Sequence, residues 1–116
     1  MAGPLPDPQT AFRDTNKAEV MLGQSLFYDP ILSGNRNISC ATCHHPRFAT
    51  SDGVSLGIGD GGIGLGPDRK VTSENTPEQR IPRNAPALFN LGATQFTAFF
   101  HDGRLEEDAN LPSGFR

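Results

Sequence analysis

Two cysteines and a histidine form the strongest chemical signal in this chain. Cys40-Ala41-Thr42-Cys43-His44 has the C-x-x-C-H spacing at which c-type haem is attached. One helical turn presents both thiols to the two haem vinyl groups, and the tethered imidazole reaches the iron. The chain contains 2 cysteines, and both lie in this pentapeptide. The sequence therefore predicts one covalent haem c on Cys40 and Cys43, with His44 as the proximal iron ligand.

Other chemistries fit the cysteine pair less well. A zinc site needs a second ligand pair at a distance, whereas the remaining histidines are His45, beside the motif, and the isolated His101. A redox-active dithiol needs a βαβ context, and a disulfide within one helical turn would constrain almost nothing. Successive helical side chains diverge, so we expect His45 to face solvent or a haem propionate instead of the iron.

The ligand on the opposite face of the iron is left open by the sequence. Met21 lies in an apolar stripe, which is more typical of a core residue than of a ligand, and no methionine follows the haem motif. His101 is either a direct ligand or a residue packed near the haem edge. An open iron would admit a small molecule such as peroxide, whereas ligation by both His44 and His101 would make an electron carrier.

The elements that must position these residues are predicted to be a few short helices joined by long loops. Hydrophobic periodicity and turn residues predict helices over residues 16–28, 40–45 and 85–91. Their N-terminal caps are Asn16, Ser39 and Asn84. No convincing pair of strands is found. The predicted fold class is mainly α, in the form of a small cytochrome c-like haem domain.

A glycine-rich loop over residues 52–83 separates the haem motif from the third predicted helix. Half of the residues from Gly53 to Gly66 are glycine, which disfavours both helix and strand. Loops of this length are usually functional or mobile. This loop could cover and uncover the distal face of the haem, or it could be a plain surface loop.

Composition supports one small domain organised by something other than its own core. The chain has 116 residues, of which 35% are apolar, with 13 Gly and 10 Pro. A net charge of −3 with scattered basic residues excludes a nucleic-acid footprint, and no apolar run is long enough to span a bilayer. We expect residues 1–15 to form an extended arm, 16–105 the haem domain, and 106–116 a tail or the start of a missing second domain.

The expected location is the periplasm. Haem is attached covalently outside the cytoplasm, and the first residues show neither the basic nor the apolar region of a signal peptide. We therefore expect a mature form from which an export signal has been removed.

Four blocks of the sequence, residues 22–33, 38–44, 83–90 and 99–104, together carry a family resemblance. In content and order they resemble the N-terminal haem domain of the bacterial di-haem cytochrome c peroxidases, including the methylamine-utilisation enzymes that oxidise a protein substrate. The resemblance implies a periplasmic α-helical cytochrome c fold, with His44 as the proximal ligand of the peroxidatic haem. It also implies a second c-type haem in a following domain and a calcium ion between the domains. Asn84 matches the family's calcium-binding asparagine, although it could equally serve as a helix cap.

The chain departs from the family pattern in three places. Classical members ligate the distal face of the resting haem with a loop histidine, and the nearest match here is Asp60. Many members carry a tryptophan between the two haems, where this chain has His101. The second haem motif and the segment expected to carry the catalytic acid are missing. The resemblance thus implies half of an enzyme.

Two functions compete at this stage. The first is an oxidoreductase domain that binds hydrogen peroxide at the iron and is active only with a second haem domain or chain. Its electrons would come from a small donor protein such as a cytochrome c or a cupredoxin, and Asp60 and His101 are its candidate catalytic residues. The second is a mono-haem electron-transfer cytochrome domain with His44 and His101 as axial ligands and no substrate chemistry.

Overall fold

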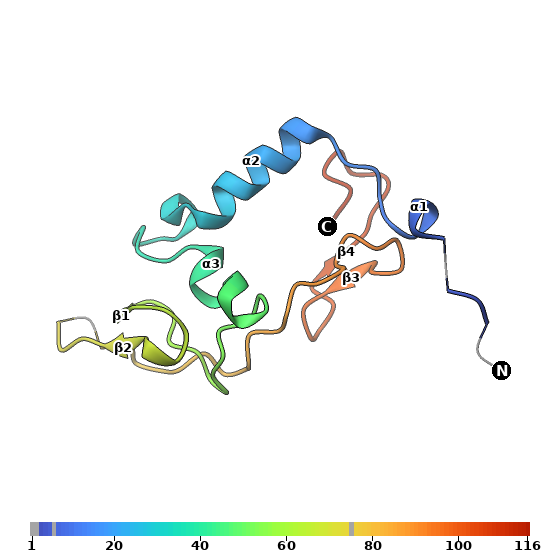
Figure 1. Cartoon of the computed structure of the whole chain (residues 1–116). Coiled ribbons are helices and arrows are strands. Elements are labelled where there is room, and N and C mark those ends of the chain that lie inside the picture. Colours follow the sequence, from blue (N-terminus) through green and yellow to red (C-terminus); the bar gives the residue numbers. More distant parts are fainter. Residues whose placement is uncertain (1–2, 6, 75) are drawn as a thin grey trace. The chain divides into compact units, whose positions relative to one another are not determined.

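The computed structural model describes residues 3–5, 7–74 and 76–116. Residues 1, 2 and 6 of the predicted arm and residue 75 of the predicted loop lie outside the described residues. The helices and strands labelled in Figure 1 are α1 (Pro8–Ala11), α2 (Lys17–Tyr28), α3 (Cys40–Cys43), β1 (Gly62–Ile63), β2 (Lys70–Val71), β3 (Ala98–Phe99) and β4 (Leu105–Glu106). Single 3₁₀ turns cover Pro30–Leu32, Pro46–Phe48 and Gly66–Asp68.

Two compact units make up the chain. We call Thr15–Phe89 the haem-motif unit, and the N-terminal segment up to Asp14 together with Asn90–Arg116 the terminal unit. The division into arm, haem domain and tail at residues 15 and 105 stays a prediction. In the described part of the chain, no helix has the length and apolar character needed to cross a membrane.

The longest helix, α2, forms where the sequence predicts it. Asn16 caps its start, since Oδ1 of Asn16 accepts a hydrogen bond from the Ala18 N–H at 2.8 Å and satisfies a donor that the helix leaves free. Asp29 ends the helix because a residue before proline avoids helical backbone. The Asp29 side chain then caps the Pro30–Leu32 turn, which leads toward α3.

The predicted helix over 85–91 is wrong, because its main-chain groups are bound elsewhere. The Ala85 carbonyl accepts a hydrogen bond from Ser51 Oγ at 2.7 Å. The Leu88 N–H donates to Thr50 Oγ1, also at 2.7 Å. A helix would need these groups for its own ladder. Contacts with the segment that follows the haem motif therefore override local helix propensity.

The predicted mainly α fold class is also wrong. Helix accounts for 26% and strand for 12% of the residues that the structure describes, so neither class dominates. Two antiparallel ladders form where the sequence predicts no strand pair: β1 pairs with β2, and β3 pairs with β4. Glycine and proline interrupt helices, whereas a tight turn can close a two-residue ladder from residues of weak strand propensity.

Arginine side chains hold the glycine-rich loop, which contains β1 and β2. Arg69 donates three hydrogen bonds to main-chain carbonyls of the loop. Its Nε donates to Ile58 at 2.6 Å, Nη2 to Gly59 at 2.7 Å and Nη1 to Gly64 at 2.8 Å. Arg80 donates to two further loop carbonyls. Carbonyls outside a regular ladder need other donors, and the two guanidinium groups supply them.

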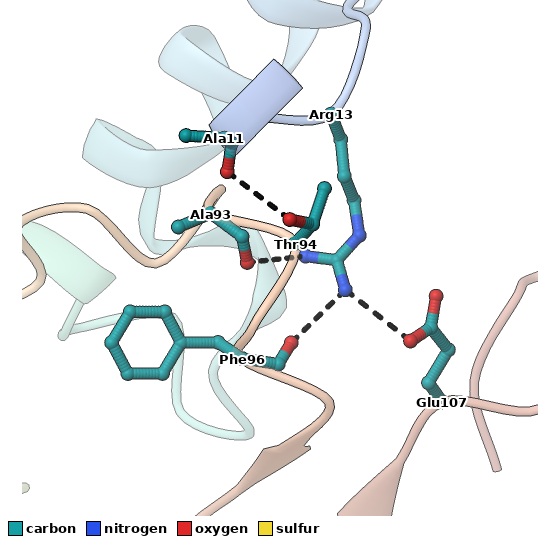
Figure 2. Close-up of polar contacts among 6 residues, drawn as sticks. All are labelled: Ala11, Arg13, Ala93, Thr94, Phe96 and Glu107. Atoms are coloured by element: carbon teal, nitrogen blue, oxygen red, sulfur yellow. Dashed lines mark hydrogen bonds and ion pairs between the residues drawn. The ribbon is translucent and has the colours of Figure 1, made fainter. Parts of the chain in front are cut away.

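Residues 7–14 are bound to the later part of the terminal unit. An isolated bridge pairs Phe12 with Ala93. Figure 2 shows the Arg13 guanidinium donating to the Ala93 carbonyl at 3.2 Å and to the Phe96 carbonyl at 3.0 Å. The same group forms an ion pair with Glu107 at 3.4 Å. The predicted arm thus contains the helical turn α1 and is held by one of its own arginines.

Few side chains are buried in the described part of the chain. The buried apolar residues are Ala41, Ile58 and Ala93, and none of the large side chains described is fully buried. Met21, for which the sequence favours a core position, is 60% exposed, and Leu32 is 70% exposed. A chain of this size needs more apolar contact than this to be stable, which supports the expectation of a prosthetic group.

Candidate haem-binding site

The helix α3 sets the spacing of the two thiols. At the start of this single turn the Ser39 N–H donates to Thr42 Oγ1 at 3.0 Å. At its end the His44 N–H donates to the Cys40 carbonyl at 2.9 Å. Thr42 is buried, whereas Cys40 is exposed and Cys43 is half-buried, and both thiols are free. Residues three apart on a helix share a face, so both sulfurs can reach one flat group.

The imidazole of His44 is held in the form that can bind iron. Its Nδ1 lies 3.1 Å from the Thr50 carbonyl oxygen and 3.0 Å from the Pro86 carbonyl oxygen. Carbonyl oxygens only accept hydrogen bonds, so Nδ1 must carry the proton and donate it. The lone pair of neutral His44 then lies on Nε2, as a metal-binding histidine requires.

Backbone strain brings the Thr50 carbonyl to His44. Ala49 and Thr50 have φ angles of 53° and 60°, in the left-handed region that costs a residue with a side chain about 1–2 kcal/mol. The Ala49 N–H donates to the Pro46 carbonyl and the Thr50 N–H to the His45 carbonyl, each at 3.1 Å, and these bonds hold the turn closed. Strain of this kind collects at functional sites, where the surrounding contacts maintain it.

The neighbouring imidazole of His45 is held in the opposite form. Its Nδ1 accepts a hydrogen bond from the Arg47 N–H at 3.1 Å, so the proton of neutral His45 is on Nε2. The ring also packs against Phe48, with 6.2 Å between the ring centroids. An imidazole held this way offers no free lone pair, so of two adjacent histidines only His44 is prepared for a metal.

The charges near the motif act on the half-buried thiol. Burial raises the pKa of the Cys43 thiol, and the charge of Asp52 raises it further, while Arg69 acts in the opposite direction. Burial also lowers the pKa of Arg69. The attachment site is therefore a partly desolvated region that receives the fields of a carboxylate and a guanidinium.

Asp60 is brought to the turn that precedes the haem motif. Its two carboxylate oxygens accept hydrogen bonds from the side-chain amides of Asn35 and Asn37, and the residue is half-buried. Both neighbours act as hydrogen-bond donors to the carboxylate. Asp60, Arg69 and Arg80 thus each form hydrogen bonds that hold the glycine-rich loop in place.

Two predicted site residues remain, His101 and Asn84. His101 is exposed in the turn between β3 and β4 of the terminal unit. Asn84 is exposed, and its Nδ2 donates to the Val54 carbonyl at 2.6 Å. The helix that Asn84 was expected to cap is absent, and the described residues contain no cluster of three or more His, Cys, Asp or Glu side chains able to hold a metal ion. Calcium at Asn84 therefore stays a prediction from resemblance.

Sequence reasoning missed four contributors to the site. The carbonyls of Thr50 and Pro86 belong to the main chain, which carries no residue signature. Asp52 is read as a loop residue because an Asp-Gly pair is typical of turns, and Arg69 is read as one of many scattered basic residues. A cluster of turn residues directly after a haem motif is the one signal that could have drawn attention to this segment.

The residues around the motif fit a haem group. The donor set consists of two free thiols and an imidazole with its Nε2 lone pair available. An apolar cleft of about 280 Å³ lies beside the exposed thiol and is lined by Asp29, Leu32, Ser33, Ile38, Ser39 and Cys40. A flat apolar porphyrin bonded at Cys40 and Cys43 would cover such exposed apolar side chains.

Comparison with known proteins also identifies a family of haem proteins. A family model described as di-haem cytochrome c peroxidase matches residues 17–113. The chain is similar to the methylamine utilization protein MauG of Methylorubrum extorquens, with 38% identity over 97 residues covering 81% of this chain and 22% of the relative. It is also similar to the cytochrome c551 peroxidase of Pseudomonas aeruginosa, with 33% identity over 106 residues covering 90% of this chain and 25% of the relative.

A third relative is also named as a cytochrome-c peroxidase. The cytochrome-c peroxidase IdrP2 of Denitromonas iodatirespirans is 37% identical over 92 residues, which cover 78% of this chain and 20% of the relative. The chain thus spans a quarter or less of the length of these three relatives, 20–25%. No solved structure matches the chain at a significant level.

Proposed function

This chain belongs to the di-haem cytochrome c peroxidase family, and we propose that it is the domain at which such an enzyme binds hydrogen peroxide. Membership makes it a peroxidase-like haem domain from an oxidoreductase family. The observation that carries the proposal is the His44 imidazole, whose Nδ1 is bound by two carbonyl oxygens so that Nε2 can coordinate iron.

Attachment uses the thiols of α3. Each of Cys40 and Cys43 would add across one haem vinyl group, so that a carbon–sulfur bond forms and the thiol hydrogen passes to the other vinyl carbon. The product is one covalent haem c. Once bound, haem supplies the iron at which the oxygen–oxygen bond of peroxide is broken. His44 orients the group and increases the electron density at the iron through its hydrogen-bonded Nδ1–H.

We assign the glycine-rich loop to the haem face opposite His44. Asp60 is its candidate proton carrier, since a carboxylate held by two amides can accept a proton from hydrogen peroxide and return it to the departing oxygen. The loop would also limit the access of water to the reacting atoms. Arg69 supports this role because it binds loop carbonyls on either side of Asp60, at Gly59 and Gly64, and Arg80 binds two carbonyls that precede it.

Electrons would enter from outside this domain. The family name implies a second haem, and we propose that a second haem domain or chain passes on electrons from a small donor such as a cytochrome c or cupredoxin. His101, exposed at the tip of the β3–β4 hairpin, is the candidate relay or gate toward that haem. The periplasm is the proposed location, because covalent haem attachment takes place outside the cytoplasm.

Spectroscopy of the haem-loaded chain tests the proposal. The ferric protein at neutral pH is expected to bind cyanide and to change its absorption spectrum on adding hydrogen peroxide. A wholly low-spin bis-imidazole electron paramagnetic resonance signal that neither compound alters would contradict it. That result would instead support an electron-transfer domain with His44 and His101 as ligands, and replacement of His101 by Ala would then change the spectrum.

A further inference from the structure

Asp52 is the one charged side chain that is buried among the described residues. It is 4% exposed, and its Oδ1 accepts a hydrogen bond from the Val54 N–H at 3.2 Å. The neighbouring Gly57 leaves room for it, since a Cβ on Gly57 would lie 2.6 Å from Asp52 Oδ2. Burying a carboxylate is costly unless other groups balance its charge. The fold nevertheless keeps one here, and the proposed peroxide chemistry does not use it.

Two arginine side chains line the same small cavity as Asp52. The cavity has a volume of about 180 Å³, and its polar lining comes from Thr42, Asp52, Arg69 and Arg80. Both guanidinium groups are held by loop carbonyls, as at Arg69 Nε on Ile58, so their charges occupy defined positions. Asp52 is therefore one member of a fixed arrangement of one negative and two positive charges.

This cavity adjoins the haem motif. Thr42 lies between the two cysteines of α3, and its buried side chain lines the cavity. Asp52 therefore shares a small cavity with the helix that carries both thiols. The Cys40 and Cys43 sulfurs of this helix are the atoms that would join the protein to the haem. A buried charge beside this helix acts on a haem that the helix holds.

We propose that the Asp52 carboxylate lowers the reduction potential of the haem held by Cys40, Cys43 and His44. Reduction adds one negative charge to the haem, and a buried carboxylate nearby opposes that addition. Because dissolved salt screens buried charges much less than exposed ones, the effect persists at high ionic strength. The inference rests on the proposed haem function, but it concerns the potential and not the reaction with peroxide.

The test is a spectroelectrochemical titration of the haem-loaded chain. Asp52→Asn keeps the shape of the side chain and the acceptor for Val54, and it removes the charge. Its midpoint potential is expected to shift to a more positive value, by the same amount at low and at high salt. The matched control is Asp68→Asn, which removes an exposed carboxylate of the same unit, and its potential is expected to equal that of the parent.

Two variants of Arg80 provide a test of opposite sign. Arg80→Gln removes an exposed positive charge at the edge of the cavity and is expected to shift the potential to a more negative value at low salt, whereas Arg80→Lys keeps the charge and the potential. Disturbed packing alone would not move the potential in opposite directions for Asp52→Asn and Arg80→Gln. If Asp52→Asn does not fold, Asp52→Ser removes the same charge with a smaller side chain, and an unchanged potential in that variant overturns the inference.

The outcomes separate this inference from the proposed function. An unchanged potential in Asp52→Asn with an intact haem spectrum overturns the inference and leaves the proposed function standing. A parent chain that binds haem but ignores peroxide and cyanide overturns the proposed function, while the shift in Asp52→Asn still supports the inference. A parent chain that takes up no haem overturns both.

Discussion

The haem-motif unit and the terminal unit each contain an arginine bound to main-chain carbonyls, but the two arginines have different surroundings. Each unit binds an arginine side chain to main-chain carbonyls where regular secondary structure is short. In the haem-motif unit, Arg69 binds three loop carbonyls and lines a cavity that contains the buried Asp52. In the terminal unit, Arg13 binds two carbonyls and an exposed carboxylate, and so ties the N-terminal segment to residues 93–107.

The difference lies in what surrounds each arginine. Around Arg69 a carboxylate is buried, and a strained turn nearby aims a carbonyl at a histidine. Around Arg13 the partners are half-buried or exposed, and the contacts only hold chain segments together. Chemistry is therefore expected in the haem-motif unit, where desolvation makes charges and lone pairs effective, and the terminal unit is expected to support it.

The largest expected effect separates the histidines of the two units. His44→Ala removes the Nε2 ligand while the thioethers still hold the haem, so peroxide-dependent activity should fall more than about 100-fold and the Soret band should shift. His101→Ala in the terminal unit should leave the ferric spectrum unchanged. Absorption spectra and a peroxidase assay of both variants check this, and a shift in His101→Ala with none in His44→Ala would reverse the assignment.

The second-largest expected effect is on the free energy of unfolding and compares Arg69 with Arg13. Arg69→Met leaves three loop carbonyls without their donor and should lower the free energy of unfolding by about 4 kcal/mol. Arg13→Met loses weaker and more exposed bonds and should cost about 1–2 kcal/mol. Chemical denaturation of the haem-loaded chain measures both. Equal losses would show that burial does not distinguish the two sites.

A glycine in each unit provides a comparison of packing. Gly66 has a φ of 55°, and a Cβ there would lie 2.3 Å from the Phe48 ring, so Gly66→Ala should cost about 3 kcal/mol through clash and strain together. Gly103 has a φ of 67°, but the nearest atom to its Cβ would be 3.9 Å away, so Gly103→Ala should cost about 1 kcal/mol. Thermal unfolding of the two variants ranks them, and the reverse order would contradict the packing described around Phe48.

The smallest expected effect is a local pH response in the terminal unit. Hydrogen bonds from the Arg104 side chain lower the pKa of Asp102 from 3.8 to about 2. A carboxyl with a lowered pKa contributes stability above its ordinary value, and that contribution is lost as the pH falls from about 4 to about 2. An NMR titration of the Asp102 carboxyl should give a midpoint near pH 2, which should return toward 3.8 in Arg104→Gln. A midpoint that the substitution leaves unmoved would contradict the pairing.

The sequence predicts the parts of the fold that depend on neighbouring residues. The cap at Asn16 and the end of α2 at Asp29 depend on groups within four positions, and both are confirmed. The helix predicted over residues 40–45 begins at Cys40 as expected but ends at Cys43, two residues early. The helix over 85–91 fails because Thr50 and Ser51 take its main-chain groups. The mainly α class fails with it, since glycine-rich ladders have no strong local signature.

For the site, the sequence by itself predicted which residues would bond to haem and determined which family the chain belongs to. The spacing of Cys40, Cys43 and His44 is local, because one helical turn relates them. Only the tertiary structure decided that His44, and not His45, presents a free Nε2, since one of the carbonyls that hold its Nδ1 belongs to Pro86, 42 residues away in the chain. Burial of Asp52 likewise depends on loop closure, which residues far apart in sequence establish together.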